Sequence, residues 1–486
     1  MGYMRLSLDI IAVDRNSAEP MHRQIYGTLR SYILEGRIGA QTLLPSTRTL
    51  AEDLKIGRNT VIAAYDQLFA EGFIESRPGL GTWVASIPER RPAFQAETRC
   101  SSLRLSRRGR IMAEGPQLPH RAGLVSLRPG EPESASFPFS TWSSLLVRNS
   151  RSRDENLLNY TSYGGHAGLR ETIAGNVCLS RGIDCSPEQV VVVTGAQAAL
   201  DLVSRILLDE GDHAWLEEPG YQGATGALLA AGARLAPLRV SRQGWHLDDP
   251  DLPPPRLIYV TPSCQWPLGS TMRIEDRLRL LDIAERSDAW IIEDDYDGDY
   301  YFHGRPIPAL RALDRTDRVI YIGTFGKTLV PAVRIGYLVV PKELVGPFER
   351  AVSISGQFAP LILQASVNDF IRQGYFATHL RRMRRLYAER QTNFIRLCAE
   401  HLGEWLAVAE NDCGMQLLAT FKQPLRDSDV VAAARKEGLD VHPVSTTYHL
   451  TEPQQGLMLG YAALDEHKAL RAVLALRAAF QRLTRP

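Results

Sequence analysis

The strongest constraint on the fold is a rhythm of short apolar runs in the longer, C-terminal part of the chain. Five such runs are each followed by polar or glycine-rich residues, and helical stretches separate them: Val190–Val193, Ala214–Leu216, Leu257–Val260, Trp290–Ile292 and Val319–Ile322. Strands that alternate with helices form largely parallel sheets. We therefore expect residues 124–486 to form an α/β domain with a mostly parallel central sheet, and a smaller helix-rich part from about residue 370.

Residues 18–86 have a different pattern, which predicts three helices and a hairpin. Apolar residues recur at helical spacing in a first helix (Ile25, Leu29, Tyr32, Ile33). Pro45-Ser46 opens a second helix with Ser46 as its N-cap, and a third helix turns Val61, Ala64, Tyr65 and Leu68 inward. Phe73-Ile74 and Trp83-Val84 flank a Gly/Pro tip and predict a two-stranded wing.

Residues 87–123 lie between these parts and lack sustained periodicity. They are rich in arginine and predict an extended, basic linker. The first 110 residues carry 16 basic and 11 acidic side chains, and the rest carry 40 and 44. A basic head on an acidic body is typical of a phosphate-binding module joined to another domain.

Composition excludes several classes of protein. A chain of 486 residues is too long for one core of usual size. No apolar run approaches a membrane span, and the N-terminus does not resemble a signal peptide. Six cysteines without a close pair argue against a disulfide scaffold and against a zinc site, so we expect no metal and a cytoplasmic location.

The head resembles the winged helix-turn-helix of the GntR family of regulators. The resemblance rests on Leu44-Pro45-Ser46-x-Arg48, Gly57-Arg58-Asn59-Thr60-Val61, Leu68-x-x-Glu71-Gly72-Phe73-Ile74 and Arg77-Pro78-Gly79-x-Gly81-Thr82. A recognition helix needs hydrogen-bond donors at the end that enters the major groove. The expected DNA-binding residues are Ser46, Arg48, Arg58, Asn59, Thr60, Arg77, Gly79 and Gly81.

The body resembles fold-type I aminotransferases, which use pyridoxal 5′-phosphate. Lys327 follows a predicted strand in Gly323-Thr324-Phe325-Gly326-Lys327, where a glycine-flanked turn can hold an amine for a Schiff base. The resemblance implies that Arg334 and Thr324 bind the cofactor phosphate.

An acidic run, Glu293-Asp294-Asp295-Tyr296-Asp297, follows another predicted strand. A carboxylate at the pyridine nitrogen keeps the ring protonated. Asp294 and Asp295 are rivals for this position. Alternation along the strand end places Asp294 and Tyr296 on one side, so we favour Asp294. The resemblance implies that Tyr296 bonds the phenolic oxygen of the cofactor.

Further cofactor contacts are expected at strand ends. Gly195-Ala196-Gln197 opens a helix, whose N-terminal N–H groups can bind phosphate. The resemblance implies that Tyr221 stacks on the pyridine ring. It also implies that Tyr160 reaches the phosphate of a neighbouring subunit, which requires a homodimer.

Two positions depart from the enzyme pattern, and one departs from the pattern of the regulators. Aminotransferases carry asparagine where this chain has Trp266, and regulators of this kind carry histidine where it has Cys264. Met458 aligns with the arginine that binds the substrate carboxylate. Trp266 and Met458 argue against efficient transamination of amino acids.

Head and body together resemble the MocR subgroup of GntR regulators. The resemblance implies a transcription regulator that binds operator DNA and senses an amine, an amino acid or a B6 vitamer. An active aminotransferase with a vestigial head is the alternative, and a DNA-binding protein whose body only dimerises is a third.

Overall fold

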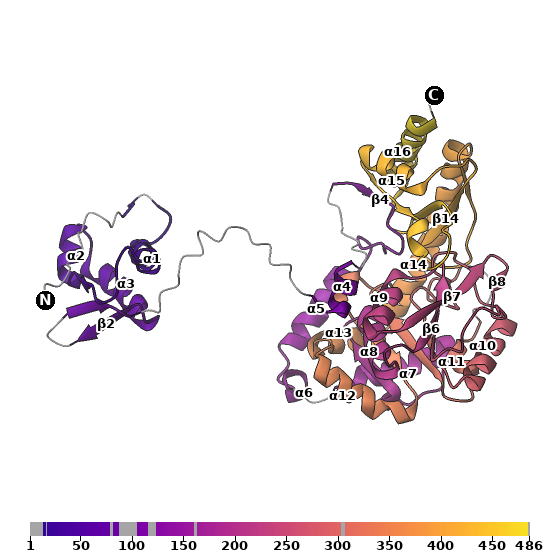
Figure 1. Cartoon of the computed structure of the whole chain (residues 1–486), viewed down its shortest axis with the longest axis horizontal. Coiled ribbons are helices and arrows are strands. Elements are labelled where there is room, and N and C mark those ends of the chain that lie inside the picture. Colours follow the sequence, from indigo (N-terminus) through magenta and orange to yellow (C-terminus); the bar gives the residue numbers. More distant parts are fainter. Residues whose placement is uncertain are drawn as a thin grey trace. The chain divides into compact units, whose positions relative to one another are not determined.

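The computed structural model describes residues 13–15, 17–77, 81–86, 105–114, 123–159, 163–302 and 307–484 (Figure 1). The chain divides into two compact units, residues 1–104 and 105–486, which are described separately below. Within the described residues, no helix is both long and apolar enough to cross a membrane.

The first unit contains the three predicted helices and the predicted wing. The helices are α1 (Met21–Leu34), α2 (Thr47–Asp53) and α3 (Arg58–Ala70). Strands β2 (Ile74–Arg77) and β3 (Gly81–Val84) pair antiparallel. A strand that was not predicted, β1 (Leu43–Leu44), pairs with β3 because Leu44 enters the core. The expected inward residues of α3 are all buried.

The second unit begins with α4 (Arg107–Glu114), which corrects the expectation of an extended linker at these residues. The helix packs on α9 (Gln222–Ala231). Arg107 and Arg108 also form ion pairs with Glu210, at 3.6 and 3.8 Å. Periodicity could not reveal α4 because the helix has only eight residues.

The central sheet has eight strands in the order β5-β12-β11-β10-β9-β6-β7-β8. The strands are β5 (Val190–Val193), β6 (His213–Glu218), β7 (Arg234–Ser241), β8 (Gly244–Trp245), β9 (Leu257–Val260), β10 (Trp290–Asp294), β11 (Val319–Thr324) and β12 (Gly336–Val339). All five predicted strands are present. Pairing is parallel from β11 through β7, whereas β12 runs antiparallel to both neighbours. The mostly parallel α/β fold is confirmed.

Both faces of this sheet are covered by helices, which explains the uninterrupted apolar runs. The four valines of β5 alternate between faces. Val191 and Val193 pack with α8 (Ala196–Leu207), α9 and α12 (Val345–Ser355). Val190 and Val192 pack with α7 (Ala167–Arg181), α13 (Leu361–Arg372) and α14 (Tyr375–Leu402). Farther along the sheet, α10 (Ile274–Arg286) covers β9 and β10.

The C-terminal part contains a sheet of its own as well as the predicted helices. Its strands are β13 (Leu406–Val408), β14 (Gln416–Phe421), β17 (Gly456–Gly460) and β16 (His442–Pro443), all antiparallel. Helices α15 (Asp427–Lys436) and α16 (Glu466–Thr484) lie beside it (Figure 1). The short strand β4 (Val125–Ser126) joins this part by pairing with β15 (Leu439–Asp440).

Candidate functional site

A cavity of about 520 Å³ lies where the carboxyl ends of the central strands meet the C-terminal part. Ligands bind at such strand ends in α/β sheets. The structure brings nearly all of the predicted cofactor residues to its wall: Gly195, Ala196, Gln197, Tyr221, Asp294, Tyr296, Thr324, Lys327 and Arg334. Tyr160 lies outside the described residues.

Lys327 presents its amine to the cavity from the turn after β11. Its Nζ donates a hydrogen bond to the Gly130 carbonyl at 2.6 Å. Burial lowers the pKa of Lys327, and the nearby Asp297 carboxylate partly offsets that effect. A lowered pKa increases the fraction of neutral amine, which is the nucleophilic form.

Asp294 presents one free carboxylate oxygen to the same cavity. The hydroxyl of Tyr259, on β9, donates to Oδ2 at 2.9 Å. The other oxygen, Oδ1, is buried and has no hydrogen-bond partner among the described residues. Burial raises the pKa of Asp294 to about 7. A buried acceptor without a partner is costly, so this oxygen is suited to a donor from a ligand.

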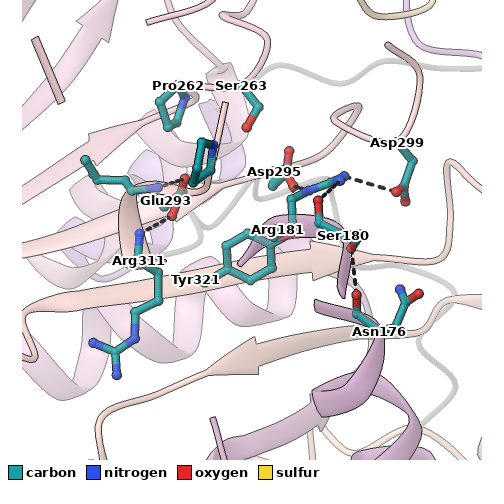
Figure 2. A network of polar contacts seen from close by, with 12 residues as sticks. Asn176, Ser180, Arg181, Pro262, Ser263, Glu293, Asp295, Asp299, Arg311 and Tyr321 are labelled. Atoms are coloured by element: carbon teal, nitrogen blue, oxygen red, sulfur yellow. Dashed lines mark hydrogen bonds and ion pairs between the residues drawn. The ribbon is translucent and has the colours of Figure 1, made fainter. Parts of the chain in front are cut away.

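Asp295 does not line the cavity and instead belongs to a polar network with Arg181 and Tyr321 (Figure 2). Arg181 Nε contacts its Oδ2 at 2.5 Å, and the Tyr321 hydroxyl donates to the same oxygen at 2.6 Å. Arg181 also reaches Asp299 at 3.0 Å. Burial alone would raise the pKa of Asp295, but Arg181 and Tyr321 outweigh it and lower the pKa. Each of the two carboxylates has one buried oxygen without a hydrogen-bond partner among the described residues. They differ because Asp295 is paired with the Arg181 cation, whereas only Asp294 lines the cavity.

An anion cradle forms at the start of α8. Gly195 is the N-cap residue, with φ of 92°, and the first N–H groups of α8 follow it. The Arg334 guanidinium lies beside this turn, because a Cβ added to Gly195 would be 3.8 Å from Arg334 Cζ. Thr324 and Gly326 contribute to the same wall. A helix N-terminus with an arginine is suited to a phosphate.

Aromatic side chains form another part of the wall. The Trp266 ring lies 6.3 Å from that of Tyr221 and 5.8 Å from that of Tyr296, both edge to face. Tyr221 Oη is 3.3 Å from Gln197 Oε1. Met458, on β17, also lines the cavity. Trp266 and Met458 thus occupy the site itself, whereas Cys264 is buried beside Tyr296.

Glu218, at the end of β6, links the C-terminal part to this wall through hydrogen bonds. Its Oε1 accepts hydrogen bonds from three consecutive backbone N–H groups, those of His449, Leu450 and Thr451, at 2.7 to 3.0 Å. Gly220 N also donates to Thr447 O at 2.9 Å. The loop that carries Thr446 and Thr447 to the cavity is therefore fixed to the central sheet.

The predicted DNA-contacting residues of the first unit lie mostly on an exposed helix end. Arg58, Asn59 and Thr60 form the first turn of α3, and the first two are exposed. Ser46 caps α2 by accepting from Thr49 N at 3.1 Å. Arg48 contacts Glu52 at 3.1 Å on the exposed face of α2.

Of the predicted wing residues, Gly81 is the one whose surroundings the structure describes. Gly81 has φ of 108°, a backbone conformation that favours glycine, and a Cβ there would approach Leu43 Cδ1 to 2.9 Å. Gly79 and the side chain of Arg77 lie outside the described residues.

Sequence reasoning missed the cavity residues that come from distant segments. These are Arg128, Gly130 and Glu131 from the segment after β4, Tyr259 from β9, and His442, Thr446 and Thr447 from the C-terminal part. Tyr259 had a usable signal. It pairs with Ile292 in the parallel sheet, so it lies on the face from which Asp294 projects. The others had no local signal.

Comparison with known proteins identifies a family for each of the two parts of the chain. Residues 21–84 match the family of bacterial regulatory proteins, gntR family, and residues 130–476 match aminotransferase class I and II. The chain is 52% identical to the probable rhizopine catabolism regulatory protein MocR of Rhizobium meliloti, across 97% of this chain and 96% of that one. It is 28% identical to the pyridoxine biosynthesis regulator PdxR of Corynebacterium glutamicum, across 96% and 97%.

The body is also similar to a solved enzyme. The α-aminoadipate aminotransferase LysN of Thermus thermophilus, complexed with N-(5′-phosphopyridoxyl)-L-leucine, has 28% identity and a TM-score of 0.69, covering 74% of this chain and 93% of that one. The aminotransferase fold implies binding of pyridoxal phosphate. The chain belongs to the MocR-type GntR regulators, HTH-type transcription regulators that carry an aminotransferase-like domain.

Proposed function

We propose that this regulator holds pyridoxal phosphate in the cavity and changes its operator affinity when an amine effector, or the cofactor itself, binds there. The observation that carries the proposal is the presence of Lys327, the free oxygen of Asp294 and the anion cradle in one cavity of a chain that also presents an exposed Arg58-Asn59 helix end.

The cavity fits the cofactor group by group. Lys327 would bond the aldehyde carbon, and Asp294 Oδ1 would accept from the pyridine nitrogen, which supplies the partner that this buried oxygen lacks. Arg334, Thr324 and the first N–H groups of α8 would hold the phosphate. When bound, the cofactor supplies a reversible covalent link to primary amines and an electron-withdrawing ring.

Other properties of the cavity depend on the side chains of the protein itself. Burial keeps part of the Lys327 amine neutral, so that it can exchange with an effector amine. Tyr296 and Trp266 exclude water from one wall. Met458 stands where an aminotransferase has the arginine that binds the substrate carboxylate. The lack of a cation at this position favours sensing over turnover.

The head would read DNA with the start of α3. Arg58 and Asn59 are suited to base edges, and Thr60, Arg48, Arg77 and the wing glycines Gly79 and Gly81 to the backbone. A homodimer would place two heads on repeated half-sites and supply Tyr160 to the neighbouring cavity. The name of the R. meliloti relative favours control of catabolic genes over control of vitamin B6 synthesis. We place this function in the cytoplasm.

Lys327→Ala tests the cofactor assignment. The wild-type protein should be yellow, and borohydride reduction followed by peptide mapping should find the cofactor on Lys327 alone. The variant should lose both signals. Reduced cofactor on another lysine would contradict the assignment.

Operator affinity tests the regulatory assignment. Candidate amines should change both the cofactor absorbance and operator affinity, with a coupling of typically about 1–3 kcal/mol. Steady production of a keto acid with unchanged DNA binding would favour the aminotransferase alternative. A colourless protein that still binds DNA would favour the dimerisation scaffold.

A further inference from the structure

Two buried cysteines lie beside the cavity and have no part in the proposed function. Cys264 belongs to the turn after β9, and Cys413 lies just before β14 in the C-terminal part. Their exposed fractions are 2% and 0%. The two cysteines are far apart in the sequence, so the fold alone brings them together.

Contacts from both sides place the two thiols next to each other. Cys413 Sγ donates to the backbone carbonyls of Ser263 and Gly269, at 3.6 and 3.5 Å. Both acceptors belong to the turn that carries Cys264. In return, Cys264 Sγ lies 3.0 Å from the position of a Cβ added to Gly414, the residue after Cys413. A hydrogen bond between the two thiols raises the pKa of Cys264 more than burial does.

The backbone segments that carry the thiols are fixed by other contacts. Cys413 forms an antiparallel bridge with Tyr301, in the segment after β10. The turn is closed by Gln265 N, which donates to Ser270 O at 2.8 Å. Two cysteines whose side chains point apart cannot be bridged without backbone movement. The thiols of Cys264 and Cys413 face each other, so a bond between them needs mainly rotation of the two side chains.

Tyr296 connects the thiol pair to the cavity. Its side chain lines the cavity, and its hydroxyl is hydrogen-bonded to the Cys264 thiol. Gln416 Nε2 also donates to that hydroxyl, at 3.4 Å. A thiol both donates and accepts weak hydrogen bonds, whereas a disulfide sulfur has no proton to donate. Oxidation of Cys264 therefore alters the hydrogen bonding of a residue in the cavity wall.

The same arrangement gives a small oxidant a route to the pair. Cys264 lies one side chain behind the cavity wall, and the cavity of about 520 Å³ is far larger than a molecule of hydrogen peroxide. The raised pKa of Cys264 leaves little thiolate, which is the reactive form. We therefore expect oxidation to take minutes to hours rather than seconds.

We propose that Cys264 and Cys413 are a redox modification site, at which hydrogen peroxide converts the two thiols into a disulfide. In the first step the O–O bond of the peroxide breaks, Cys264 Sγ becomes a sulfenic acid, and one water leaves. In the second step Cys413 Sγ displaces the hydroxyl group, the S–S bond forms, and a second water leaves with the remaining thiol proton. The thiols lose two electrons, which the peroxide accepts. A thiol reductant reverses the change, as is typical of disulfides that act as redox sensors.

The disulfide would join the turn that carries Trp266 to the C-terminal part in front of β14. Glu218 links that part to the central sheet at another point, through hydrogen bonds alone. A covalent link restricts the unfolded chain and so stabilises the folded one. The inference goes beyond the proposed function, since it concerns the protein's own thiols and needs neither an amine nor DNA.

Peptide mapping of the full-length protein tests the inference. The folded protein is treated with hydrogen peroxide at neutral pH, the remaining thiols are blocked with N-ethylmaleimide in denaturant, and the protein is digested without reduction. Cys398 and Cys413 share a tryptic peptide, so a second protease that cleaves after Glu400 is needed to separate them. Mass spectrometry should find one peptide that joins Cys264 to Cys413, and dithiothreitol should remove it.

Variants assign the link to its residues. Cys264→Ala and Cys413→Ala should each lose the cross-linked peptide. Cys398→Ala removes another buried thiol and is the matched control, so it should keep the link. Oxidation should raise the melting temperature of the body by several degrees in the wild-type protein and in the control, but not in the first two variants. It should also shift the cofactor absorbance of the wild-type protein and not that of Cys413→Ala, because Tyr296 changes its hydrogen bonding only when the disulfide forms.

The outcomes are separate from those of the proposed function. A reversible link between Cys264 and Cys413 would support the inference even in protein that has no cofactor colour. Oxidation of the exposed Cys178 while both buried thiols stay reduced would overturn it. Conversion of Cys264 to a sulfinic acid without a cross-link would also overturn it. An unchanged cofactor absorbance in cross-linked, cofactor-loaded protein would overturn the connection through Tyr296.

Discussion

Replacing Tyr259 with phenylalanine should destabilise the body in a pH-dependent way. The tyrosine hydroxyl is buried and donates to Asp294 Oδ2 at 2.9 Å, while the other carboxylate oxygen has no partner among the described residues. A hydrogen bond to a charged group contributes about 1.5–3 kcal/mol, and one to a neutral group about 0.5–1.5 kcal/mol. The variant therefore loses about 1 kcal/mol more when Asp294 is ionised than when it is protonated.

This difference corresponds to a pKa increase of roughly one unit, at 1.36 kcal/mol per unit. The folded-state pKa of Asp294, about 7, already lies above its unfolded value because of burial. Its contribution to stability is therefore fully present at low pH and is lost as pH rises through that pKa. In the variant, the contribution of Asp294 to stability should continue to fall over about one further pH unit. Tyr259 itself stays protonated, since burial raises its pKa well above 10.

The assay is urea unfolding of the cofactor-free protein at pH 6 and pH 9, followed by tryptophan fluorescence. Six of the seven tryptophans lie in the body, so the signal reports on that unit. Tyr259→Phe should cost about 1 kcal/mol more at pH 9 than at pH 6. In an Asp294→Asn background the cost should be the same at both pH values. An equal cost at both pH values in the otherwise wild-type protein would refute the argument.

Three further substitutions test other contacts. Ser46→Ala should lower the stability of the head by about 1 kcal/mol because α2 loses its cap, and an unchanged melting temperature of the head would contradict this. Arg181→Met should lower the free energy of unfolding in urea by about 3–5 kcal/mol, because Asp295 stays buried without its cation. The control Arg148→Met, at a partly exposed ion pair, should lower it by less than about 1 kcal/mol. Equal losses in the two variants would refute the argument. Arg58→Ala should weaken operator binding by about 1–3 kcal/mol at one base position, measured by fluorescence anisotropy at fixed salt, and unchanged affinity would show that α3 does not read the DNA.

The sequence predicted the elements whose pattern is local. The five buried strands were found because helices cover both faces of the sheet and leave their apolar runs uninterrupted. The alternation that placed Asp294 and Tyr296 on one side is also local, and both residues line the cavity.

Features that depend on distant pairing were not predicted. Strand β12 lies between β11 and β5 in the antiparallel direction, which no local pattern specifies. Arg128 and Glu131 reach the cavity because their segment rests on Gly460, more than 300 residues later in the chain. The roles of Lys327, Arg334 and Tyr221 remain predictions that the cofactor experiments will test.

The contact at Glu218 makes opening of the cavity measurable by hydrogen–deuterium exchange in a single peptic fragment. Three adjacent amides, those of His449, Leu450 and Thr451, donate to one carboxylate oxygen on the central sheet, and all three must lose that acceptor if the loop moves away. Their deuterium uptake therefore reports how often the C-terminal part separates from the sheet. Comparing that uptake with and without an amine measures how much the amine changes the free energy of this local opening, independently of any DNA.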